Sequence, residues 1–280
     1  MAKNSPIEWT HHTFNPWWGC TKVSAACDNC YADTWARRMG HHLWGADAPR
    51  RFFTDHHWKE PLAWNADAEM NKARARVFCA SMADVFEKRP ELSGPRNRLW
   101  KLIDDTPNLD WLLLTKRPQN VGKMVPWGDK WPDNVWLGTT VEDQTAAEKR
   151  LPFLTNYPAA VRFLSCEPLL GPINLVPWFR QKEKYNIDWV IAGGESGHGA
   201  RPMHPDWASS LLAQCKKAKV PFHFKQWGHW VPAELMKDVS PKVIQLGKER
   251  PVEMARVSKK LAGRTLGGTV WNGLPLVANA

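Results

Sequence analysis

Residues 13–32 read TFNPWWGCTKVSAACDNCYA and place three cysteines, Cys20, Cys27 and Cys30, within eleven positions. The two residues between Cys27 and Cys30 allow a short turn that brings both sulfurs to the same side. Cys20 can join them if the intervening loop folds back, and that loop contains no bulky side chain that would prevent it. The spacing therefore predicts that three thiols meet at one centre, around which the rest of the chain is organised.

Three thiolates without an obvious fourth partner are compatible with two kinds of metal site. A closed structural zinc site usually has four protein ligands, and His11 or His12 could supply the fourth. An iron–sulfur cluster is normally held by four thiolates, so three cysteines would leave one iron free to bind another molecule. A third alternative is three thiols without a metal, which their close spacing disfavours. Of the two metals, the rest of the chain favours the iron–sulfur cluster.

The length and composition of the chain suit a large α/β protein. Its 280 residues are enough for one large barrel or two small domains, and 43% hydrophobic residues support a sizeable core. No apolar run is long enough for a transmembrane helix, and the first residues lack the apolar segment of a signal peptide. We therefore expect a cytoplasmic protein without membrane contact, in which six cysteines are metal ligands and free thiols rather than disulfides.

The charge of the chain indicates a polyanionic partner. Lys and Arg number 38 against 28 Asp and Glu, a formal net charge of +10. Nucleic acid is the first candidate, although an enzyme can also simply be basic. Residues 32–75 are rich in His, Trp and Arg, a mixture that suits phosphate contact and base stacking. The side chains expected to make these contacts are Arg37, Arg38, Arg50, Arg51, Trp35, Trp44 and Trp58.

From residue 76 onward, short apolar runs alternate with helix-like stretches. The runs cover residues 77–81, 111–115, 135–141, 161–166, 189–194 and 221–224, and the clearest helices cover 95–105, 144–154 and 205–219. Continuous apolar runs suit strands that are buried on both faces, and the alternation predicts a parallel sheet. With one more strand before Cys20, we expect an α/β fold, a full or partial TIM-like (β/α) barrel. A doubly wound open sheet is the alternative.

We expect the barrel to form a single domain over residues 1–280. Within it, residues 32–75 form an insertion and residues 234–280 form a closing segment. Each predicted strand ends in polar or charged residues, and in a (β/α) barrel these ends line one mouth, where ligands bind. Six such ends in succession are interpreted as one site. The residues are Asp84, Lys116, Arg117, Glu142, Glu167, Glu195, Lys225 and Gln226.

Several motifs resemble a phage-encoded three-Cys-motif protein family. They are IEWT at residues 7–10, GCTKVS at 19–24, CDNCYA at 27–32, LTKRP at 114–118, GTTVE at 138–142, SCEPLLG at 165–171, GGESG at 193–197 and FKQWG at 224–228. That family is similar to radical S-adenosylmethionine enzymes. The resemblance implies a (β/α) barrel, a [4Fe–4S] cluster on Cys20, Cys27 and Cys30, S-adenosylmethionine as cosubstrate and an electron donor for the cluster. A phage origin would place the protein in the cytoplasm of the host cell.

The cysteine spacing departs from the C-x3-C-x2-C of ordinary radical enzymes, and Asn29 stands where they have an aromatic residue before the last cysteine. Tyr31 is therefore the candidate for contact with adenine. The remaining roles are inferred from strand position. The residues expected to hold S-adenosylmethionine are Ser81 and Asp84 for its amino group, Thr115 and Arg117 for its carboxylate, and Thr140, Glu142, Ser165 and Glu167 for its ribose. Glu195 and Lys225 are the expected catalytic residues, in contact with substrate.

The leading hypothesis is a radical enzyme that modifies a nucleobase or nucleotide, as part of phage DNA modification. A base in a duplex would have to be extruded to reach the barrel mouth, and a free nucleotide is the other possible substrate. The alternative function is a zinc-stabilised nucleic-acid-binding protein without catalysis. A row of polar strand ends disfavours that alternative, because a structural zinc module needs no such mouth.

Overall fold

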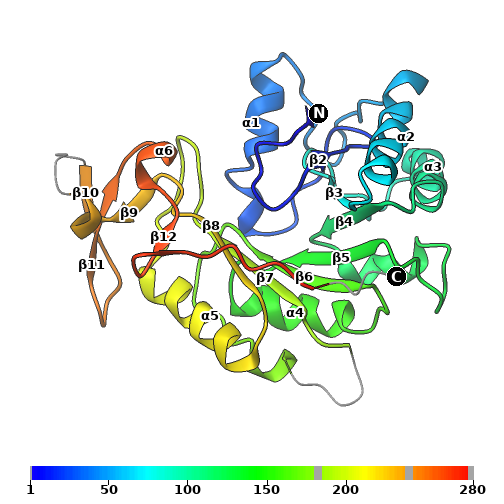
Figure 1. Cartoon of the computed structure of the whole chain (residues 1–280). Helices are drawn as coiled ribbons and strands as arrows, with labels where there is room; N and C mark the ends of the chain where they lie inside the picture. Colours follow the sequence, from blue (N-terminus) through cyan, green and yellow to red (C-terminus); the bar gives the residue numbers. More distant parts are fainter. Residues whose placement is uncertain (1, 180–184, 237–241, 277–280) are drawn as a thin grey trace.

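The computed structural model describes residues 2–179, 185–236 and 242–276. Its centre is an eight-stranded sheet in which the strands lie in the order of the chain (Figure 1). The first pair is antiparallel, and the seven strands from β2 to β8 are parallel. The strands are β1 (Ala2–Lys3), β2 (His12–Thr13), β3 (Ala75–Cys79), β4 (Leu109–Thr115), β5 (Val135–Thr140), β6 (Val161–Cys166), β7 (Trp189–Gly193) and β8 (Phe222–Gln226).

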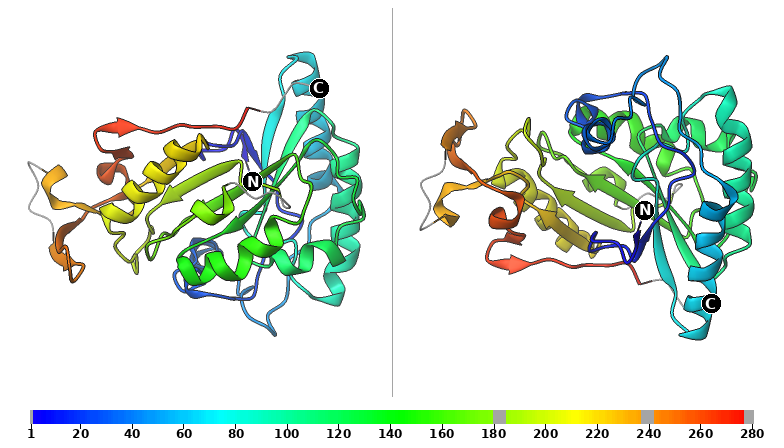
Figure 2. Two further views of the ribbon diagram at one scale, coloured as in Figure 1. Left: turned by 90° about the horizontal axis from the view of Figure 1, so that it is seen from below. Right: turned by 90° about the horizontal axis from the view of Figure 1, so that it is seen from above.

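The sheet curls into part of a barrel, so the partial form of the predicted barrel is confirmed and the doubly wound sheet is wrong (Figure 2). All six apolar runs form strands, and β2 is the additional strand that leads into the cysteine loop. Every residue of β5 and β6 is buried, as expected for strands covered on both faces.

Helices pack on the outer, convex face of the sheet (Figures 1 and 2). They are α2 (Asp55–Met70), α3 (Ser93–Asp104), α4 (Gln144–Leu154) and α5 (Pro205–Ala218), and their apolar faces enter the main hydrophobic core. The side chain of Asp143 accepts a hydrogen bond from the backbone N–H of Ala146 at 2.7 Å and so caps the start of α4. At the end of α5, Lys219 adopts a left-handed backbone conformation that stops the helix.

Residues 32–75 differ from the expected exposed insertion. The helix α1 (Tyr31–Arg38) follows the cysteine loop, and α2 is the crossover between β2 and β3. Trp58 is only 5% exposed and packs in the core, while Arg50 is 6% exposed and pairs with Glu87. The prediction that Arg50 and Trp58 contact nucleic acid is therefore wrong. Composition identified the residue types in this segment. It could not show that Trp58 lies on the inward face of α2 or that Arg50 has a buried acidic partner.

Aromatic side chains fill the interior of the curled sheet. Trp9, Phe78, Trp136, Phe163 and Trp189 form a buried cluster on its concave side. A Cβ atom on the glycine at position 138 would lie 2.4 Å from the Phe163 ring, so the close packing of this layer requires glycine there. Trp9 and Phe78 of this layer line the cavity that lies toward the carboxyl ends of the strands.

The segment after β8 adds a small antiparallel sheet, with strand order β10-β11-β9, that the sequence reading did not predict. Its elements are β9 (Trp230–Pro232), β10 (Lys242–Leu246) and β11 (Val252–Arg256), followed by α6 (Lys259–Ala262), β12 (Thr265–Leu266) and β13 (Thr269–Val270). The chain then returns along β8. Phe224 N–H donates to the carbonyl of Trp271 at 3.0 Å and Gly273 N–H to that of Phe222 at 2.9 Å. This return covers the edge of β8.

Within residues 2–179, 185–236 and 242–276, no helix is both long and apolar enough to span a bilayer. The expectation that residues 1–280 form one domain stays a prediction.

Candidate functional site

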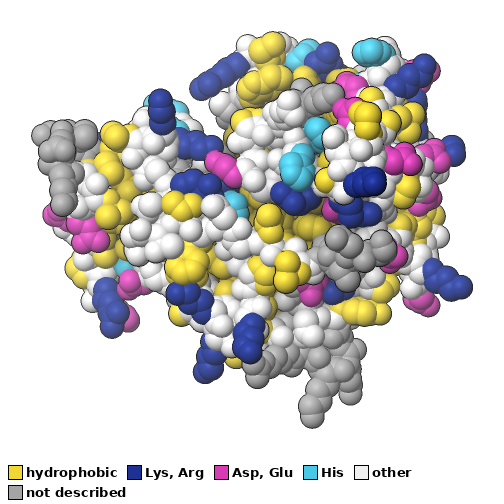
Figure 3. All heavy atoms as spheres, in the orientation of Figure 1, with side chains coloured by type: hydrophobic (Ala, Val, Ile, Leu, Met, Phe, Trp, Pro, Cys, Tyr) yellow, Lys and Arg dark blue, Asp and Glu magenta, His cyan; other side chains and the backbone are white. Residues whose placement is uncertain are grey.

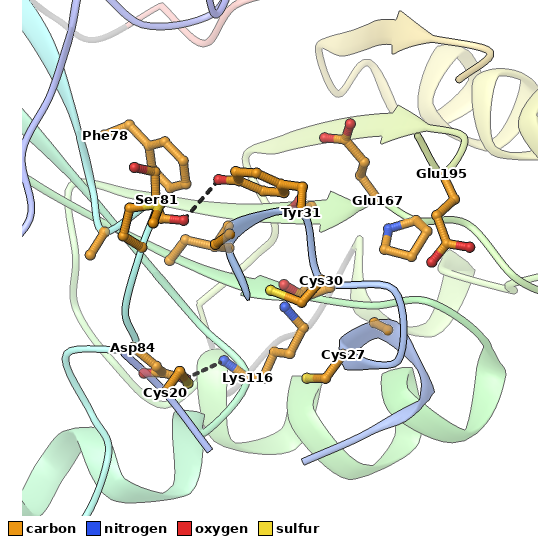
Figure 4. A pocket seen from close by; sticks show the side chains of 18 of the residues that line it. Cys20, Cys27, Cys30, Tyr31, Phe78, Ser81, Asp84, Lys116, Glu167 and Glu195 are labelled. Carbon is orange, nitrogen blue, oxygen red and sulfur yellow. Dashed lines mark hydrogen bonds between the residues drawn. The ribbon is translucent and has the colours of Figure 1, made fainter. Parts of the chain in front are cut away.

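A cavity of about 480 Å3 opens at the carboxyl ends of the parallel strands (Figure 4). All the predicted site residues except Glu142 line it. These are Cys20, Cys27, Cys30, Tyr31, Ser81, Asp84, Thr115, Arg117, Thr140, Ser165, Glu167, Glu195 and Lys225. The floor includes Trp9 and Phe78 from the aromatic layer. The parallel sheet thus brings residues that are far apart in the chain to one mouth, as the strand-end pattern predicted.

The three cysteines of the first loop differ from the other three of the chain. Cys20 follows β2, Cys27 ends a short 3-10 helix (Ala25–Cys27), and Cys30 immediately precedes α1. All three are partly exposed and line the cavity, whereas the remaining cysteines, Cys79, Cys166 and Cys215, are buried in the fold. Only the first loop therefore offers thiols to a ligand.

Cys20 lies beside a charged pair. Its sulfur is 3.6 Å from Nη1 of Arg117, and that guanidinium also bonds Asp84. Burial raises the pKa of the Cys20 thiol to about 12, with Asp84 adding to the rise and Arg117 opposing it. The thiol is therefore protonated at neutral pH unless a cation binds it, and metal binding at this position must release a proton.

The thiols do not converge on one point in this structure. Among residues 2–179, 185–236 and 242–276, no three His, Cys, Asp or Glu side chains are close enough to share a metal ion. Figure 4 shows the Lys116 side chain extending toward Cys30, among the three cysteines. Neither His11 nor His12 lines the cavity, so the structure gives no support to either as a fourth zinc ligand. The fit to a cluster therefore rests on the donor atoms, three accessible thiols on one loop.

Asp84 holds Arg117 in place beside the cysteines. Its carboxylate accepts hydrogen bonds from Arg117 Nη1 at 2.9 Å, the hydroxyl of Thr115 at 2.7 Å and the backbone N–H of Lys116 at 3.0 Å. Arg117 also donates to the carbonyl of Thr21 at 2.6 Å. These bonds fix the guanidinium at the cavity wall.

A second ion pair lies on the opposite wall. The Lys225 ammonium donates to Glu167 at 2.9 Å, and the side-chain amide of Gln226 donates to the same carboxylate at 3.0 Å. Both charged side chains stay about one-sixth exposed, at 16% for Lys225 and 17% for Glu167, so they remain in reach of a ligand in the cavity. Tyr31 closes part of the mouth, with its hydroxyl donating to the carbonyl of Ser81 at 2.8 Å.

Glu142 is not brought into the cavity. Its side chain is 2% exposed and pairs with Arg150 at 2.6 Å. Burial opposes its ionisation, but the hydrogen bonds from Arg150 outweigh burial and lower the pKa of Glu142 below its ordinary value. Glu142 was predicted to line the mouth because it closely follows the end of β5. That position in the sequence does not determine the direction in which its side chain points.

Glu195 belongs to a clamp, formed with Arg201 and Asn29, that the sequence reading missed. The carboxylate of Glu195 receives Arg201 Nη2 at 2.6 Å, Arg201 Nε at 2.9 Å and the side-chain amide of Asn29 at 2.9 Å. Arg201 also donates to the carbonyl of Ala25 at 2.8 Å. A Cβ atom at Gly199 would lie 2.8 Å from Asn29, so the two loops approach as closely as glycine permits. The clamp joins the end of β7 to the turn between Cys27 and Cys30.

The clamp keeps Glu195 ionised. Burial would raise its pKa, but the hydrogen bonds from Arg201 and Asn29 outweigh burial, and the pKa of Glu195 lies below its ordinary value. Glu195 is therefore a charged acceptor that is already occupied by two partners. The contacts support a role in holding the cysteine loop.

We expect Arg201→Ala to loosen the cysteine loop without unfolding the sheet. Charge-assisted hydrogen bonds contribute about 1.5–3 kcal/mol each, so amide hydrogen exchange of residues 25–30 should accelerate roughly tenfold or more. Arg250→Ala is the matched control, because that side chain is 84% exposed and forms only a 3.9 Å contact with Asp206. Exchange that is equally slow in both variants would contradict the role of the clamp.

The chain was compared with solved structures, with curated proteins and with protein-family models. Two mutants of spore photoproduct lyase are among the solved structures similar to the chain. One, with bound AdoMet and dinucleoside spore photoproduct, shows 10% identity and a TM-score of 0.45, and the match covers 90% of this chain and 70% of that chain. The other shows 13% identity, a TM-score of 0.41, and coverage of 92% and 71%. No curated protein matches the chain. A family model described as "Protein of unknown function (DUF5131)" matches residues 4–275.

Proposed function

Because this chain belongs to the DUF5131 family of proteins of unknown function, we propose its activity from its own site: it is a radical S-adenosylmethionine enzyme. The observation that supports this most is the separation of the cysteines into two groups. Three accessible thiols of one loop face the cavity at the strand ends, while the other three are buried. A loop that served only for packing would not keep its thiols at the wall of a ligand-sized cavity.

Cys20, Cys27 and Cys30 are proposed to hold a [4Fe–4S] cluster with one open iron. A cluster there would pass one electron to bound S-adenosylmethionine, giving methionine and a 5′-deoxyadenosyl radical that takes a hydrogen atom from the substrate. The protein holds the thiols in one loop, fixes that loop through the clamp and places it over a cavity floored by aromatic side chains. That floor excludes water from below the reacting atoms.

The strand-end groups are proposed to bind S-adenosylmethionine. Arg117, fixed by Asp84, offers a guanidinium of the kind that recognises a carboxylate. Asp84 is already engaged by Arg117, so Ser81 is the better candidate for the amino group, with Thr115 beside the carboxylate. The remaining contacts are proposed for Tyr31 with adenine and for Thr140, Ser165 and Glu167 with the ribose. Glu142 is left out because it does not line the cavity.

The substrate is proposed to be a nucleobase or nucleotide. A second cavity, of about 540 Å3, adjoins the first and shares Tyr31 and Ser81 with it. Its lining includes Trp18, Arg38 and Trp35, and Trp35 is 43% exposed, so an aromatic face and a cation are available to a base and a phosphate. Lys225 is proposed to contact the substrate from the first cavity.

Anaerobic reconstitution with iron and sulfide tests this function. The wild-type protein should retain about four iron and four sulfide per chain and show the absorption and EPR signals of a [4Fe–4S] cluster. With dithionite as reductant it should cleave S-adenosylmethionine to methionine and 5′-deoxyadenosine. Protein purified without oxygen that holds one zinc and no iron would instead support a zinc-stabilised binding protein.

A further inference from the structure

A third cavity, of about 570 Å3, lies next to the cysteine cavity, and six of its thirteen lining residues are Lys or Arg. The two cavities share Thr21, Val23, Lys116 and Arg117 as a common wall. We call this third space the basic cavity. Its positively charged lining consists of Lys88, Arg89, Lys116, Arg117, Lys149 and Arg150. On the face seen in Figure 3, Lys and Arg side chains are scattered rather than gathered in one patch.

The arginines of the basic cavity are already neutralised. The pairs are Arg89 with Glu91 at 2.6 Å, Arg117 with Asp84 at 2.9 Å and Arg150 with Glu142 at 2.6 Å. Glu87 is the acidic residue in the lining, and it is paired with the buried Arg50 at 2.7 Å. No lining carboxylate is therefore left to balance another cation.

The three lysines are different. In the part of the chain that the structure describes, the side chains of Lys88, Lys116 and Lys149 form no ion pair with a carboxylate. Lys88 and Lys149 are exposed at the cavity, and Lys116 is partly buried in the wall shared with the cysteine cavity. Lys88 and Lys149 place two unbalanced ammonium groups at this concave space, and Lys116 adds its charge from the shared wall, with its side chain extending toward Cys30 (Figure 4). Together they focus a positive potential there that attracts an anion.

We propose that the basic cavity binds phosphate groups of the substrate. This inference deepens the proposed function and rests on it for the identity of the substrate as a nucleotide. Ammonium groups are suitable point charges for phosphate, and the cavity has the volume of a small-ligand site rather than of a flat protein-docking surface. Because Lys116 and Arg117 belong to both cavities, a phosphate held here leaves the attached nucleoside beside the cysteine loop. The phosphate comes either from a free nucleotide or from a nucleic-acid strand.

The test compares two double variants of the whole chain. Lys88→Ala with Lys149→Ala removes two free cations of the basic cavity and leaves Lys116 in place. Lys59→Ala with Lys217→Ala is the matched control, since both lysines are exposed on helices α2 and α5 and line none of the three cavities. The probes are the four deoxynucleoside 5′-monophosphates, the corresponding nucleosides and a twelve-residue single-stranded oligonucleotide, titrated by calorimetry.

The cavity variant is expected to bind a phosphorylated probe about tenfold or more weakly, because each lost charge-assisted hydrogen bond costs at least a factor of this order. Nucleoside binding and the control variant should stay unchanged. If a strand is the source of the phosphates, the slope of log affinity against log salt for the oligonucleotide should fall by about 0.7 for each lysine removed. If a free nucleotide is the source, the effect appears with the monophosphates and the slope for the oligonucleotide does not change.

Unchanged affinity for every phosphorylated probe, or no binding of any probe by the wild-type protein, overturns the proposal. Normal probe binding combined with slower reduction by an acidic electron carrier also overturns it, because the lysines would then dock the electron donor.

Iron and sulfide measured in the same preparations separate the two proposals. A wild-type protein with zinc and lysine-dependent phosphate binding refutes the radical function alone. A cluster that cleaves S-adenosylmethionine, together with a cavity variant that binds normally, refutes the phosphate site alone.

Discussion

Reconstituted Cys20→Ala protein is expected to lose its iron–sulfur absorption and EPR signal, and Cys27→Ala and Cys30→Ala should do the same. With only three thiols in the cavity, each removal leaves two, too few to hold the cluster. The loss of bound iron should exceed the roughly 10–100-fold weakening that follows removal of a residue that only supports a metal ligand. Iron and sulfide retained after gel filtration under nitrogen measure the effect.

Cys215→Ala is the control for these variants. Cys215 is buried on α5 and does not line the cavity, so its removal changes the thiol count without changing the proposed ligand set. It should retain the full cluster. A full cluster in Cys20→Ala, or equal loss in Cys215→Ala, would show that the ligand set is not the one proposed.

The second large effect concerns the buried pair of Arg50 and Glu87, in which the side chains are 0% and 4% exposed. Arg50 Nη1 donates to the carbonyl of Leu43 at 3.0 Å, and Nη2 donates to the hydroxyl of Thr21 at 3.0 Å, next to Cys20. Glu87→Ala leaves this guanidinium buried without a counter-charge. We therefore expect a loss of about 3–5 kcal/mol in the free energy of unfolding. Equilibrium urea denaturation measures it.

Two further variants serve as controls for Glu87→Ala. Asp105→Asn removes an exposed partner of Lys101, with side chains 77% and 46% exposed, and should cost less than about 1 kcal/mol. Replacing both members of the buried pair, with Arg50→Met and Glu87→Leu, should restore part of the stability because no charge is then left unpaired. A Glu87→Ala loss no larger than that of Asp105→Asn would disprove the burial argument.

The six strands from β3 to β8 were predictable because each lies on a short, predominantly apolar run. The run at residues 161–166 became β6 with the same limits, and the helix expected at residues 144–154 became α4 with the same limits. The common mouth followed from parallel strands alone, which is why Ser165 and Lys225 line one cavity although sixty positions separate them in the chain.

The parts that were not predictable depend on contacts between distant segments. Asn29 and Glu195 meet across 166 positions, and no spacing in the sequence indicates that pair. Glu142 was misplaced because alternation of side chains ends with the strand at Thr140, so the direction of a residue two positions later is set by its partner Arg150. Arg50 was misplaced for the same reason. An arginine in a basic segment is expected to be exposed, and its burial follows from its pairing with the distant Glu87.

The clamp has a mechanical consequence for an unclosed barrel. A closed barrel keeps its radius because its last strand hydrogen-bonds to its first. Among the residues that the structure describes, the sheet runs in order from β1 to β8 and these two strands are not paired. Glu195 and Arg201, which follow β7, instead hydrogen-bond across the mouth to Asn29 and Ala25, in the loop that follows β2. Flattening or tightening of the sheet therefore moves the turn that carries Cys27 and Cys30. The curvature of the sheet and the position of this turn at the mouth are linked through the bonds of the clamp.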